Sequence, residues 1–561
     1  MPAVLLSGRQ AMSADLKHLS QIFAGLKKER GGWENLWRDI RDYEVPDLGC
    51  FEGEAPHDGG KRYQRLYDAE AAEAADIMAA GLLSGLSSPS RPWLRLTTMD
   101  PDLDESPDVK QWLADIQQAM LMQFAKSETY NSLHRSYLEL TAFGTACSII
   151  QRHPENVIDM LNLTVGEYWL ACDPYGRVDT LFRRLSMTVK QMVQRFGMDS
   201  VSNDVRKCLR DNPFERRNII HAIVPRVDRD IMKADKLNKP FASVYWEEGR
   251  ENDPALEESG FDEFPALCPR WLITGSSVYG RGPGAKALSA SKSLQRLHNR
   301  LATLTDYLTN PPVQYPTKHR AFLDMYRPGG RIPVDPSDNE AIRTAWEVRT
   351  DPALIDALIE RRRQEIQRYF KVNIFQMIAA SQDGQRTATE IEALNQEKIM
   401  VMGPILERLH TELLDPLVSN AFALMVKANK IPPAPESMYG KELSIEYISV
   451  LAEQQKASSV SGILNTVQQI GLIAQLRPEV LDKLDADKAV DLLADMNNVP
   501  PSMIVAGQQV ALIRTQRQQE QQAMQQQAMA AQSASALRDL GQAADSQALQ
   551  QAVVDNGQEI V

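Results

Sequence analysis

Cysteine is scarce in this chain of 561 residues, and the few cysteines are widely spaced. There are five of them: Cys50, Cys147, Cys172, Cys208 and Cys268. No two form a CxxC pair, whereas structural zinc sites and the disulfide frameworks of secreted domains need clustered cysteines. The sequence therefore predicts neither, and it indicates a protein that is made in a reducing compartment.

Long hydrophobic runs are missing as well. The longest fully apolar run is short, as in IMAAGLL at 77–83, whereas a helix that crosses a bilayer needs about 20 such residues. The first ten residues contain too brief an apolar stretch for a secretory signal. We expect a soluble protein that is made in the cytoplasm and has no membrane partner.

The sequence signatures of enzymes are absent too. The chain has no HExxH, GxSxG or EF-hand motif, and its eight histidines show no spacing typical of metal ligands. GSSVYGRG at 275–282 has the glycine spacing of a phosphate-binding loop, but Arg281 stands in place of the lysine and Gly282 in place of the hydroxyl. Pro283 is also expected to block the helix turn that follows such a loop. We predict no catalytic, cofactor-binding or metal-binding residues.

The overall charge is acidic. Asp and Glu number 74 against 62 Lys and Arg, which gives a net charge of −12. A protein that wraps nucleic acid with its whole surface is normally basic, so that class is excluded, although a local basic patch is not. The length is several times that of a usual single core, which predicts several substructures.

The first half of the chain predicts helices followed by a sheet region. Apolar spacing and alanine content predict helices at 12–45, 66–87, 107–127 and 129–145. From about 148 to 285, short β-prone runs alternate with turn signals, which predicts a mixed, mainly β region packed on helices. The runs are SIIQR, EYWLA, VDTLFRRL, IIHAIVPRV, FASVYWEE and RWLITGS.

The clearest helix signal lies at 286–310. Its apolar residues recur at steps of four and three, a heptad seam for packing against another helix: Ala290, Leu294, Leu297, Leu301, Leu304 and Leu308. Two prolines at 311–312 end this helix. A second helix begins after Asp351, an N-cap with Pro352 at the first helical position. We predict an antiparallel hairpin whose helices are joined by a small loop-and-strand insert.

A loop and a bent helix are predicted after the hairpin. SQDGQ at 381–385 is typical of a flexible loop, and the helix after it would run to about 429. Gly403-Pro404 and Pro416 interrupt that helix, and a proline inside a helix costs about 3 kcal/mol unless a kink accommodates it.

The last part of the chain predicts short amphipathic helices at 443–499 after a linker. The tail, 508–561, has 16 glutamines and too few apolar positions for a core of its own. It is therefore either disordered alone or helical in a bundle of identical copies.

The order of these segments resembles the portal, or head-to-tail connector, proteins of short-tailed (podovirus-type) bacteriophages. The resemblance covers roughly residues 30–520, and no motif in it is catalytic. It rests on WRDIRDYEVPDLG, AAGLLSGLSSPSRPWLRL, DPYGRVDTLFRRLSMTVKQMVQRFG, GFDEFP, YGRGPGAKAL, RTATEIEALNQEK, GPILERLHTELLDPL and VPPSMIVAGQQVALIRTQR.

The resemblance implies an α+β, mainly α, portal fold with an α/β wing, a helical-hairpin stem, a small α/β clip, a kinked long helix and a helical crown. The implied parts are the wing (1–285), the stem helices (286–310 and 351–375), the clip (311–350), the channel loop (376–390), the kinked helix returning to the wing (391–435), the crown (436–505) and a Gln-rich barrel helix or disordered tail (506–561).

Candidate residues follow from the same resemblance. The channel-loop candidates are Gln382, Asp383, Gly384, Gln385 and Arg386. The clip candidates for motor or tail contact, which could equally form a solvated loop face, are Lys318, His319, Arg320, Arg327 and Arg331. The stem candidates are Arg361, Arg362 and Arg363, and the helix-kink candidates are Gly403 and Pro404. The three stem arginines lie at successive 100° steps, so they cannot all face one way. Ion pairs between subunits, made with Glu360 or Glu365, are expected for them.

The implied function is that of a structural channel and not of an enzyme. A twelve-subunit ring at the unique capsid vertex would pass double-stranded DNA, without sequence specificity, during packaging and ejection. The implied partners are further copies of the chain, the terminase motor, a tail adaptor, and the major capsid and scaffolding proteins. The location would be the virion, after assembly in the host cytoplasm. The acidic charge has two interpretations: a channel wall that repels phosphate, or an excess of acid that only keeps the protein soluble.

Two alternatives stay open. One is a helical scaffold protein that self-assembles without DNA. The other is a DNA-packaging enzyme, which would need a Walker lysine or a cluster of metal-binding carboxylates.

Overall fold

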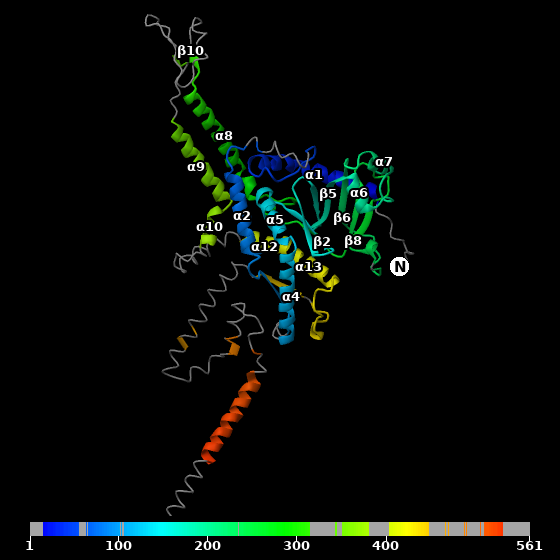
Figure 1. The fold of residues 1–561 in the computed structure, drawn as a ribbon, viewed down its shortest axis with the longest axis vertical. Coiled ribbons are helices and arrows are strands. Elements are labelled where there is room, and N and C mark those ends of the chain that lie inside the picture. Colours follow the sequence, from blue (N-terminus) through cyan, green and yellow to red (C-terminus); the bar gives the residue numbers. More distant parts are fainter. Residues whose placement is uncertain are drawn as a thin grey trace, which may run out of the picture. The chain divides into compact units, whose positions relative to one another are not determined.

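The computed structural model shows helices combined with antiparallel sheets (Figure 1). The described residues are 15–54, 63, 66–100, 103, 106–233, 235–314, 343–344, 351–380, 403–441, 443–447, 466, 469–470, 487–488, 490, 505 and 510–530. The chain divides into two compact units. The first comprises 1–97, 115–433 and 443–455, and the second comprises 98–114, 434–442 and 456–561.

A five-stranded antiparallel sheet lies in the first unit. Its strands, in spatial order, are β4 (Tyr168–Cys172), β5 (Val178–Thr188), β6 (Arg216–Pro225), β7 (Phe241–Glu247) and β8 (Glu257–Phe261). The register places Trp169, Phe182, Ala222 and Val244 in one row across four strands. All four are buried, so this row forms an apolar face that another element must cover.

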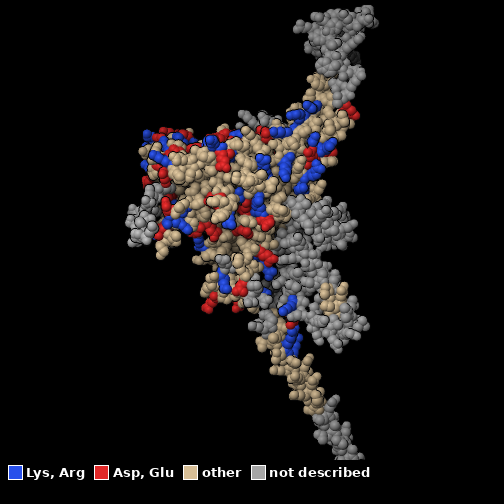
Figure 2. Space-filling model, turned by 180° about the vertical axis from the view of Figure 1, so that it is seen from behind, with Lys and Arg blue, Asp and Glu red and all other residues tan. Residues whose placement is uncertain are grey.

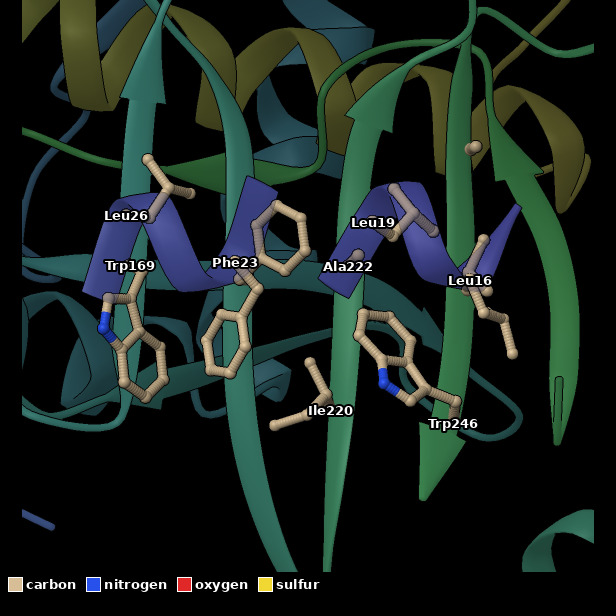
Figure 3. Packing of buried hydrophobic residues seen from close by; sticks show 11 residues of the cluster. Leu16, Leu19, Phe23, Leu26, Trp169, Ile220, Ala222 and Trp246 are labelled. Carbon is tan, nitrogen blue, oxygen red and sulfur yellow. The ribbon is translucent and has the colours of Figure 1, made fainter. Parts of the chain in front are cut away.

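Helix α1 (Leu16–Tyr43) covers that face (Figure 3). It presents Leu16, Leu19, Phe23 and Leu26, whose three- and four-residue spacing places them on one side of a helix. The ring of Phe23 meets that of Trp169 edge-on, with 4.8 Å between the centroids. The helix predicted at 12–45 is thereby confirmed.

The opposite face of the sheet is covered by two short helices, α6 (Val189–Phe196) and α7 (Asn203–Asp211). Val189, Met192 and Val205 pack there against residues of β6 and β7. Thr188 starts α6 with a capping box, in which its hydroxyl accepts from the N–H of Gln191.

A second, three-stranded sheet has the order β3-β2-β9, made of β3 (Val157–Leu163), β2 (Cys147–His153) and β9 (Ala266–Leu267). The strand predicted in RWLITGS, at 270–276, is wrong. Only an isolated bridge from Arg270 to Thr145 occurs there, beside a hydrogen bond from the N–H of Trp271 to the carbonyl of Gly144 at 2.9 Å. The N–H of Arg270 donates to the carboxylate of Glu412, so no further strand of the described part of the chain pairs on that side. Strands β3 and β8 were not predicted, since their polar residues obscure the alternation.

The remaining helices of the first half confirm the predictions. They are α2 (Glu70–Leu86), α4 (Pro107–Lys126) and α5 (Thr129–Phe143). Helices α2 and α5 pack against each other, and Ala75, Met78 and Leu140 are among their buried residues.

A helical hairpin follows. It consists of α8 (Pro283–Thr309) and α9 (Pro352–Tyr369), and α10 (Val372–Ala380) comes after it. Between the two long helices, β10 (Val313–Gln314) pairs antiparallel with β11 (Arg343–Thr344). Both predicted helices are confirmed. The expectation that Pro283 blocks a helix is wrong, because Pro283 is the first residue of α8, where its missing N–H has no helical partner to lose.

The next helix changes its winding in the middle. It consists of α12 (Gly403–Leu409), a π-helical segment (His410–Leu414) and α13 (Asp415–Lys427). Pro416 lies just after the wider π turn, so the predicted interruption near this proline is confirmed as a change of helix type.

The chain then forms a strand where a helix was expected. Strand β12 (Leu443–Tyr447) pairs with β1 (Leu94–Thr98), so the prediction of short amphipathic helices is wrong at the start of 443–499. Its sequence, LSIEY, alternates with period two, which suits a strand. The other described residues of that range are helical: 466, 469–470, 487–488 and 490. Single 3₁₀ turns occur at η1 (Lys236–Asn238) and η5 (Glu436–Met438).

In the second unit, residues 510–530 of the glutamine-rich tail form a helix. Nearly every residue of this helix is exposed, including Leu512 and Met524. Arg514 pairs with Asp487 at 2.6 Å.

Candidate functional site

The heptad seam of the hairpin packs in part as the sequence predicts, because Leu297 and Leu301 are only half-buried and Leu308 is exposed. On α8 Ala290, Leu294 and Leu304 are buried, and on α9 Ile359 and Ile366 are buried. At the start of α9, Asp351 accepts a hydrogen bond from the N–H of Ala353 at 2.9 Å. The predicted N-cap is therefore present, and the two helices form one unit.

The end of the hairpin next to the insert is different, because large apolar side chains there are exposed. They are Tyr307 and Leu308 on α8, and Leu354 and Leu358 on α9, with exposed fractions from 40% to 62%. Grouped exposed apolar residues of this kind are typical of surfaces that contact another protein.

The hairpin is basic although the chain is acidic. Helix α8 carries four basic residues and one acid, and α9 carries four arginines and three acids, so the two helices have a net charge of +4. Figure 2 shows several of these basic side chains along the hairpin. A groove of about 610 Å³ on α9 and α10 is lined by Arg361, Arg362, Gln364, Glu365, Gln367, Arg368 and Asn373.

The three predicted stem arginines point to different partners. Arg363 donates to Asp68, which lies two residues before the start of α2. Arg362 pairs with Glu365 on its own helix at 2.5 Å. Arg361 is exposed and has no ion pair within the described part of the chain. The divergence agrees with the 100° steps between consecutive helical residues.

A cluster that we name the hairpin clasp ties both long helices to the segment before α2. It consists of Asp68, Gln295, His298 and Arg363. The carboxylate of Asp68 lies 2.7 Å from Nη2 of Arg363 and 2.7 Å from Nε2 of His298. The amide of Gln295 accepts from the N–H of Asp68 at 3.0 Å and donates to its carbonyl at 2.7 Å. The clasp therefore connects α8 and α9 to one buried carboxylate.

The electrostatics of the clasp favour the ionised form of Asp68. Burial works against ionisation, but the N–H of Glu70 and the guanidinium of Arg363 outweigh it, and the pKa of Asp68 is lowered. The side chain of Asp68 is only 5% exposed, so it is held by these partners and not by water.

The first half of α8 is fixed by a second buried carboxyl group. Glu44, the C-cap residue of α1, is fully buried and accepts a hydrogen bond from the hydroxyl of Ser291 at 2.9 Å. Burial raises the pKa of Glu44 well above its usual value. Nearby, Lys292 pairs with Asp39 at 2.6 Å, so α1 holds α8 by polar contacts as well as by packing.

Two of the three glycines in the segment that resembles a phosphate-binding loop, Gly280 and Gly282, serve close packing, whereas a Cβ on Gly275 would meet nothing within 4 Å. A Cβ on Gly144, whose φ is +83°, would lie 2.2 Å from the backbone nitrogen of Gly282, so neither position has room for a side chain. Arg281 lies over the ring of Trp33, with 5.4 Å to the centroid. The last two glycines of that spacing are thus explained by packing between the end of α5 and the start of α8.

The π-helical segment binds Arg270, which follows β9 of the second sheet, through Glu412. Its carboxylate accepts from the backbone N–H of Arg270 at 2.9 Å, from Nε at 3.2 Å and from Nη2 at 2.7 Å. The side chain of Arg270 is 4% exposed. Such a buried bidentate pair has a strict geometry, so it fixes the rotation of the helix at this point.

The same segment also holds β12. The ring of His410 stacks on that of Tyr447 with 4.5 Å between centroids, and the hydroxyl of Tyr447 donates to Asp415. Trp93 stacks on the Tyr447 ring at 6.4 Å. Burial, together with the Asp415 carboxylate, raises the pKa of Tyr447 far above its usual value. The phenol therefore stays neutral and acts as a donor.

Several predicted residues lie outside the described part of the chain. These are the channel-loop candidates Gln382, Asp383, Gly384, Gln385 and Arg386, and the clip candidates Lys318, His319, Arg320, Arg327 and Arg331. Gly403 and Pro404 form the first turn of α12.

The sequence reasoning missed the clasp and the pair of Arg270 with Glu412. A local signal existed for Asp68, which accepts from the N–H of Glu70 just before an alanine-rich helix, as a capping residue would. Arg270 and Glu412 are 142 positions apart, and nothing local in either segment indicates the other.

Among the described residues, no group of three or more His, Cys, Asp or Glu side chains is arranged to hold a metal ion. In the same part of the chain, none of the helices is both long and apolar enough to span a membrane.

A hairpin that is tied to a sheet-and-helix body by buried polar contacts, and that exposes charged and apolar side chains, is typical of subunits that assemble through their surfaces. Comparison with known proteins identifies the class. The sequence pattern of the family described as "Bacteriophage head to tail connecting protein" matches residues 16–505. The chain belongs to this family.

Two relatives match over nearly their whole length. A protein named "Probable portal protein" from Bordetella phage BPP-1 is 42% identical over 533 residues, which is 95% of this chain and 96% of the relative. The "Portal protein" of Salmonella phage epsilon15 is 38% identical over 540 residues, with the same shares.

Solved structures give a weaker likeness. The "Neck of empty GTA particle computed with C6 symmetry" matches with a TM-score of 0.32 and 10% identity, over 74% of this chain and 92% of that one. A likeness at this level supports no statement about function.

Proposed function

We propose that this chain is the subunit of a portal ring, which occupies one vertex of a phage capsid and passes double-stranded DNA during packaging and ejection. The observation that carries the proposal is the match, over 95% of the chain, to two phage proteins named as portal proteins. No catalytic step is assigned to the chain. The energy for packaging would come from a separate terminase motor docked on the ring.

The division into parts is proposed on the same basis. Residues 1–285 would form the wing, α8 and α9 the stem, and 311–350 the clip. Residues 376–390 would form the channel loop, and 391–435 the helix that returns to the wing. Residues 436–505 would form the crown and 506–561 a barrel helix. The buried contacts of the clasp support a stem that acts as a rigid extension of the body.

The surface of the hairpin supports assembly with identical copies. Exposed leucines lie at one end of α9, and an open groove with charged residues lies nearer the other end. In a closed ring each stem would bury these surfaces against its neighbours, and the exposed Arg361 would be free to pair with a carboxylate of the next subunit. The net charge of +4 on the hairpin would give weak, salt-sensitive attraction to phosphate.

Microscopy of the purified protein tests the ring directly. Negative-stain images should show an annulus with an axial hole wide enough for a duplex. A compact single particle with ATPase activity would contradict the proposal and favour a packaging enzyme, and solid assemblies without a hole would favour a scaffold.

Variants of α9 test which surface makes the ring. Leu354→Ser combined with Leu358→Ser should weaken ring formation in sedimentation velocity without lowering the stability of the subunit, because both residues are already exposed in the single chain. Leu161→Ser, at another exposed leucine, is the matched control. Equal assembly of the two proteins would show that this end of α9 is not an interface.

The channel-loop and clip assignments need packaging assays. Deletion of 381–385 should leave the ring intact and lower the amount of packaged DNA. Reversing the charges of Arg327 and Arg331 should weaken docking of the motor or of the tail adaptor. Normal packaging or normal docking, respectively, would remove each assignment.

A further inference from the structure

Two cysteines that lie far apart in the sequence meet inside the second sheet. Cys147 is the first residue of β2, and Cys268 follows directly after β9. Their Sγ atoms are 3.6 Å apart, and the two residues are only 1% and 4% exposed. Neither cysteine was assigned a role by the sequence or by the portal function.

The strand register places the two cysteines directly opposite each other. Ser148 pairs with Leu267, so one step further along the antiparallel ladder Cys147 faces Cys268. Backbone hydrogen bonds flank this position: the N–H of Ala146 donates to the carbonyl of Pro269 at 3.1 Å, in step with the register. The ladder therefore continues past the end of β9.

This position in the ladder suits a cross-strand bond. The N–H groups of Ala146 and Ile150 both donate across to the segment that contains Cys268, and hydrogen-bonded pairs alternate along an antiparallel ladder, so the pair of cysteines at 147 is a non-hydrogen-bonded pair. Cα atoms of such pairs are about 4.5 Å apart, and their side chains lean toward each other. A disulfide needs Cα atoms about 4.4–6.8 Å apart, so rotation of the two side chains can close the bond without moving the strands.

We propose that Cys147 and Cys268 are a latent disulfide, reduced when the chain folds in the host and oxidised by peroxide once the particle is outside the cell. Oxidation outside the cell rests on the proposed portal function, whereas the pairing of the two cysteines does not. Peroxide is the proposed oxidant because it is small enough to reach a buried site during local opening.

The chemistry balances with one molecule of hydrogen peroxide. The thiolate of one cysteine attacks a peroxide oxygen, the O–O bond breaks, and a sulfenic acid and hydroxide form. The second thiol then attacks the sulfenic sulfur, the S–S bond forms, and water leaves. Two thiols lose two electrons and two protons, and the peroxide is reduced to two waters.

Burial sets the rate of this reaction. The thiolate is the reactive form of cysteine, and burial raises the pKa of the Cys268 thiol well above its usual value. Both thiols are also almost fully buried, so peroxide reaches them only during local opening. The pair is therefore slow to react, which keeps it reduced during the short period of synthesis and assembly.

The bond would fix the segment that leads into the hairpin. Cys268 is two residues before Arg270, which holds Glu412, and fifteen before the first residue of α8. Linking it to β2 would close a covalent loop across the body of the subunit. Cross-links of this kind stabilise mainly by restricting the unfolded chain.

The test uses the purified full-length protein and hydrogen peroxide. After long exposure, free thiols are alkylated under denaturing conditions and the protein is digested without reductant. We expect a cross-linked peptide pair that contains Cys147 and Cys268 and disappears after reduction, together with a higher midpoint of thermal unfolding. The Cys208→Ser variant, at a cysteine outside the pair, should give the same cross-link.

Two results would overturn the inference. One is that Cys147 and Cys268 remain fully alkylatable while the half-buried cysteines are oxidised. The other is that Cys268 is linked to a cysteine other than Cys147. Because both results come from the wild-type chain, they do not depend on the folding of a variant. Ring formation is scored separately by microscopy, so failure of this inference and failure of the portal function are distinguishable.

Discussion

A single methyl group added to α2 tests how closely α10 packs on that helix. A Cβ on Gly81 would lie 2.1 Å from Cδ1 and 2.9 Å from Cβ of Phe375, whereas a Cβ on Gly85, one turn later, would meet nothing within 4 Å. Both glycines are inside the same helix, so Gly→Ala gains about 0.5–1 kcal/mol of helix propensity at either position.

The two substitutions should therefore have opposite effects. Gly85→Ala should stabilise by about 0.5–1 kcal/mol. Gly81→Ala should gain the same propensity but lose about 1–3 kcal/mol to overpacking, because the contacts reach the Cβ of Phe375 and not only the far end of its ring. The net expectation is a destabilisation of up to about 2.5 kcal/mol at the contact between α2 and α10.

Hydrogen exchange resolves this effect locally, and urea unfolding gives its overall size. Amides of 372–376 should exchange faster in Gly81→Ala than in the wild type, and amides of 70–86 should exchange more slowly in Gly85→Ala. If both variants protect α2 equally and leave α10 unchanged, the close packing of Gly81 against Phe375 is refuted. The result bears on function, because the last residues of α10, 376–380, are helical and belong to the segment proposed as the channel loop, 376–390.

Three carboxyl groups give further predictions, each measured by urea unfolding over a range of pH. Asp68→Asn should lower the free energy of unfolding by about 1–2 kcal/mol at pH 7. Because the pKa of Asp68 is lowered in the folded protein, the difference between the two proteins is complete above the unfolded pKa of about 4. It should disappear as the pH falls through the pKa of the folded protein. A difference that persists at pH 2 would contradict an ionic clasp. Glu412→Gln should lower the free energy of unfolding by about 3 kcal/mol, because it leaves Arg270 buried without its counter-charge. The control is Glu407→Gln, at an exposed residue of α12, and equal effects of the two substitutions would argue against the ion pair. Burial raises the pKa of Glu139, on α5, to about 7, although the hydrogen bonds that this carboxyl group accepts oppose the shift. Its contribution to stability is therefore complete below pH 4.5 and falls as the pH rises to 7. The stability of the wild type relative to Glu139→Gln should thus drop by up to about 3 kcal/mol between pH 4 and pH 8, and a pH-independent difference would contradict the raised pKa.

The helical hairpin was predictable because its signals are local. A heptad seam, two prolines and an Asp-Pro start define α8 and α9 within their own residues, and the structure places each element where those signals are. The sheet was predictable only in part. Runs of β-branched and aromatic residues indicate β4 to β7, but β3 and β8 contain too many polar residues. RWLITGS has strand composition but forms only an isolated bridge, from Arg270 to Thr145.

Two errors have the same origin. Pro283 was expected to block a helix and instead begins one, and Leu443–Tyr447 was expected in a helical region and instead pairs with β1. In both cases the local sequence was compatible with two outcomes, because a proline can end a helix or occupy its first position, and LSIEY can lie in a helix or in a strand. For β12 the selecting contacts come from Trp93 and His410, which lie far away in the sequence.

The sequence by itself determined the family of this protein, the order of its helices and the hairpin, because periodicity, caps and proline positions act over a few residues. The tertiary structure alone decided which polar groups meet: Asp68 with Arg363, Glu412 with Arg270, and Cys147 with Cys268. Each of these contacts joins residues more than a hundred positions apart. Their energy depends on burial and on distances of a few ångströms, which chain order does not encode locally.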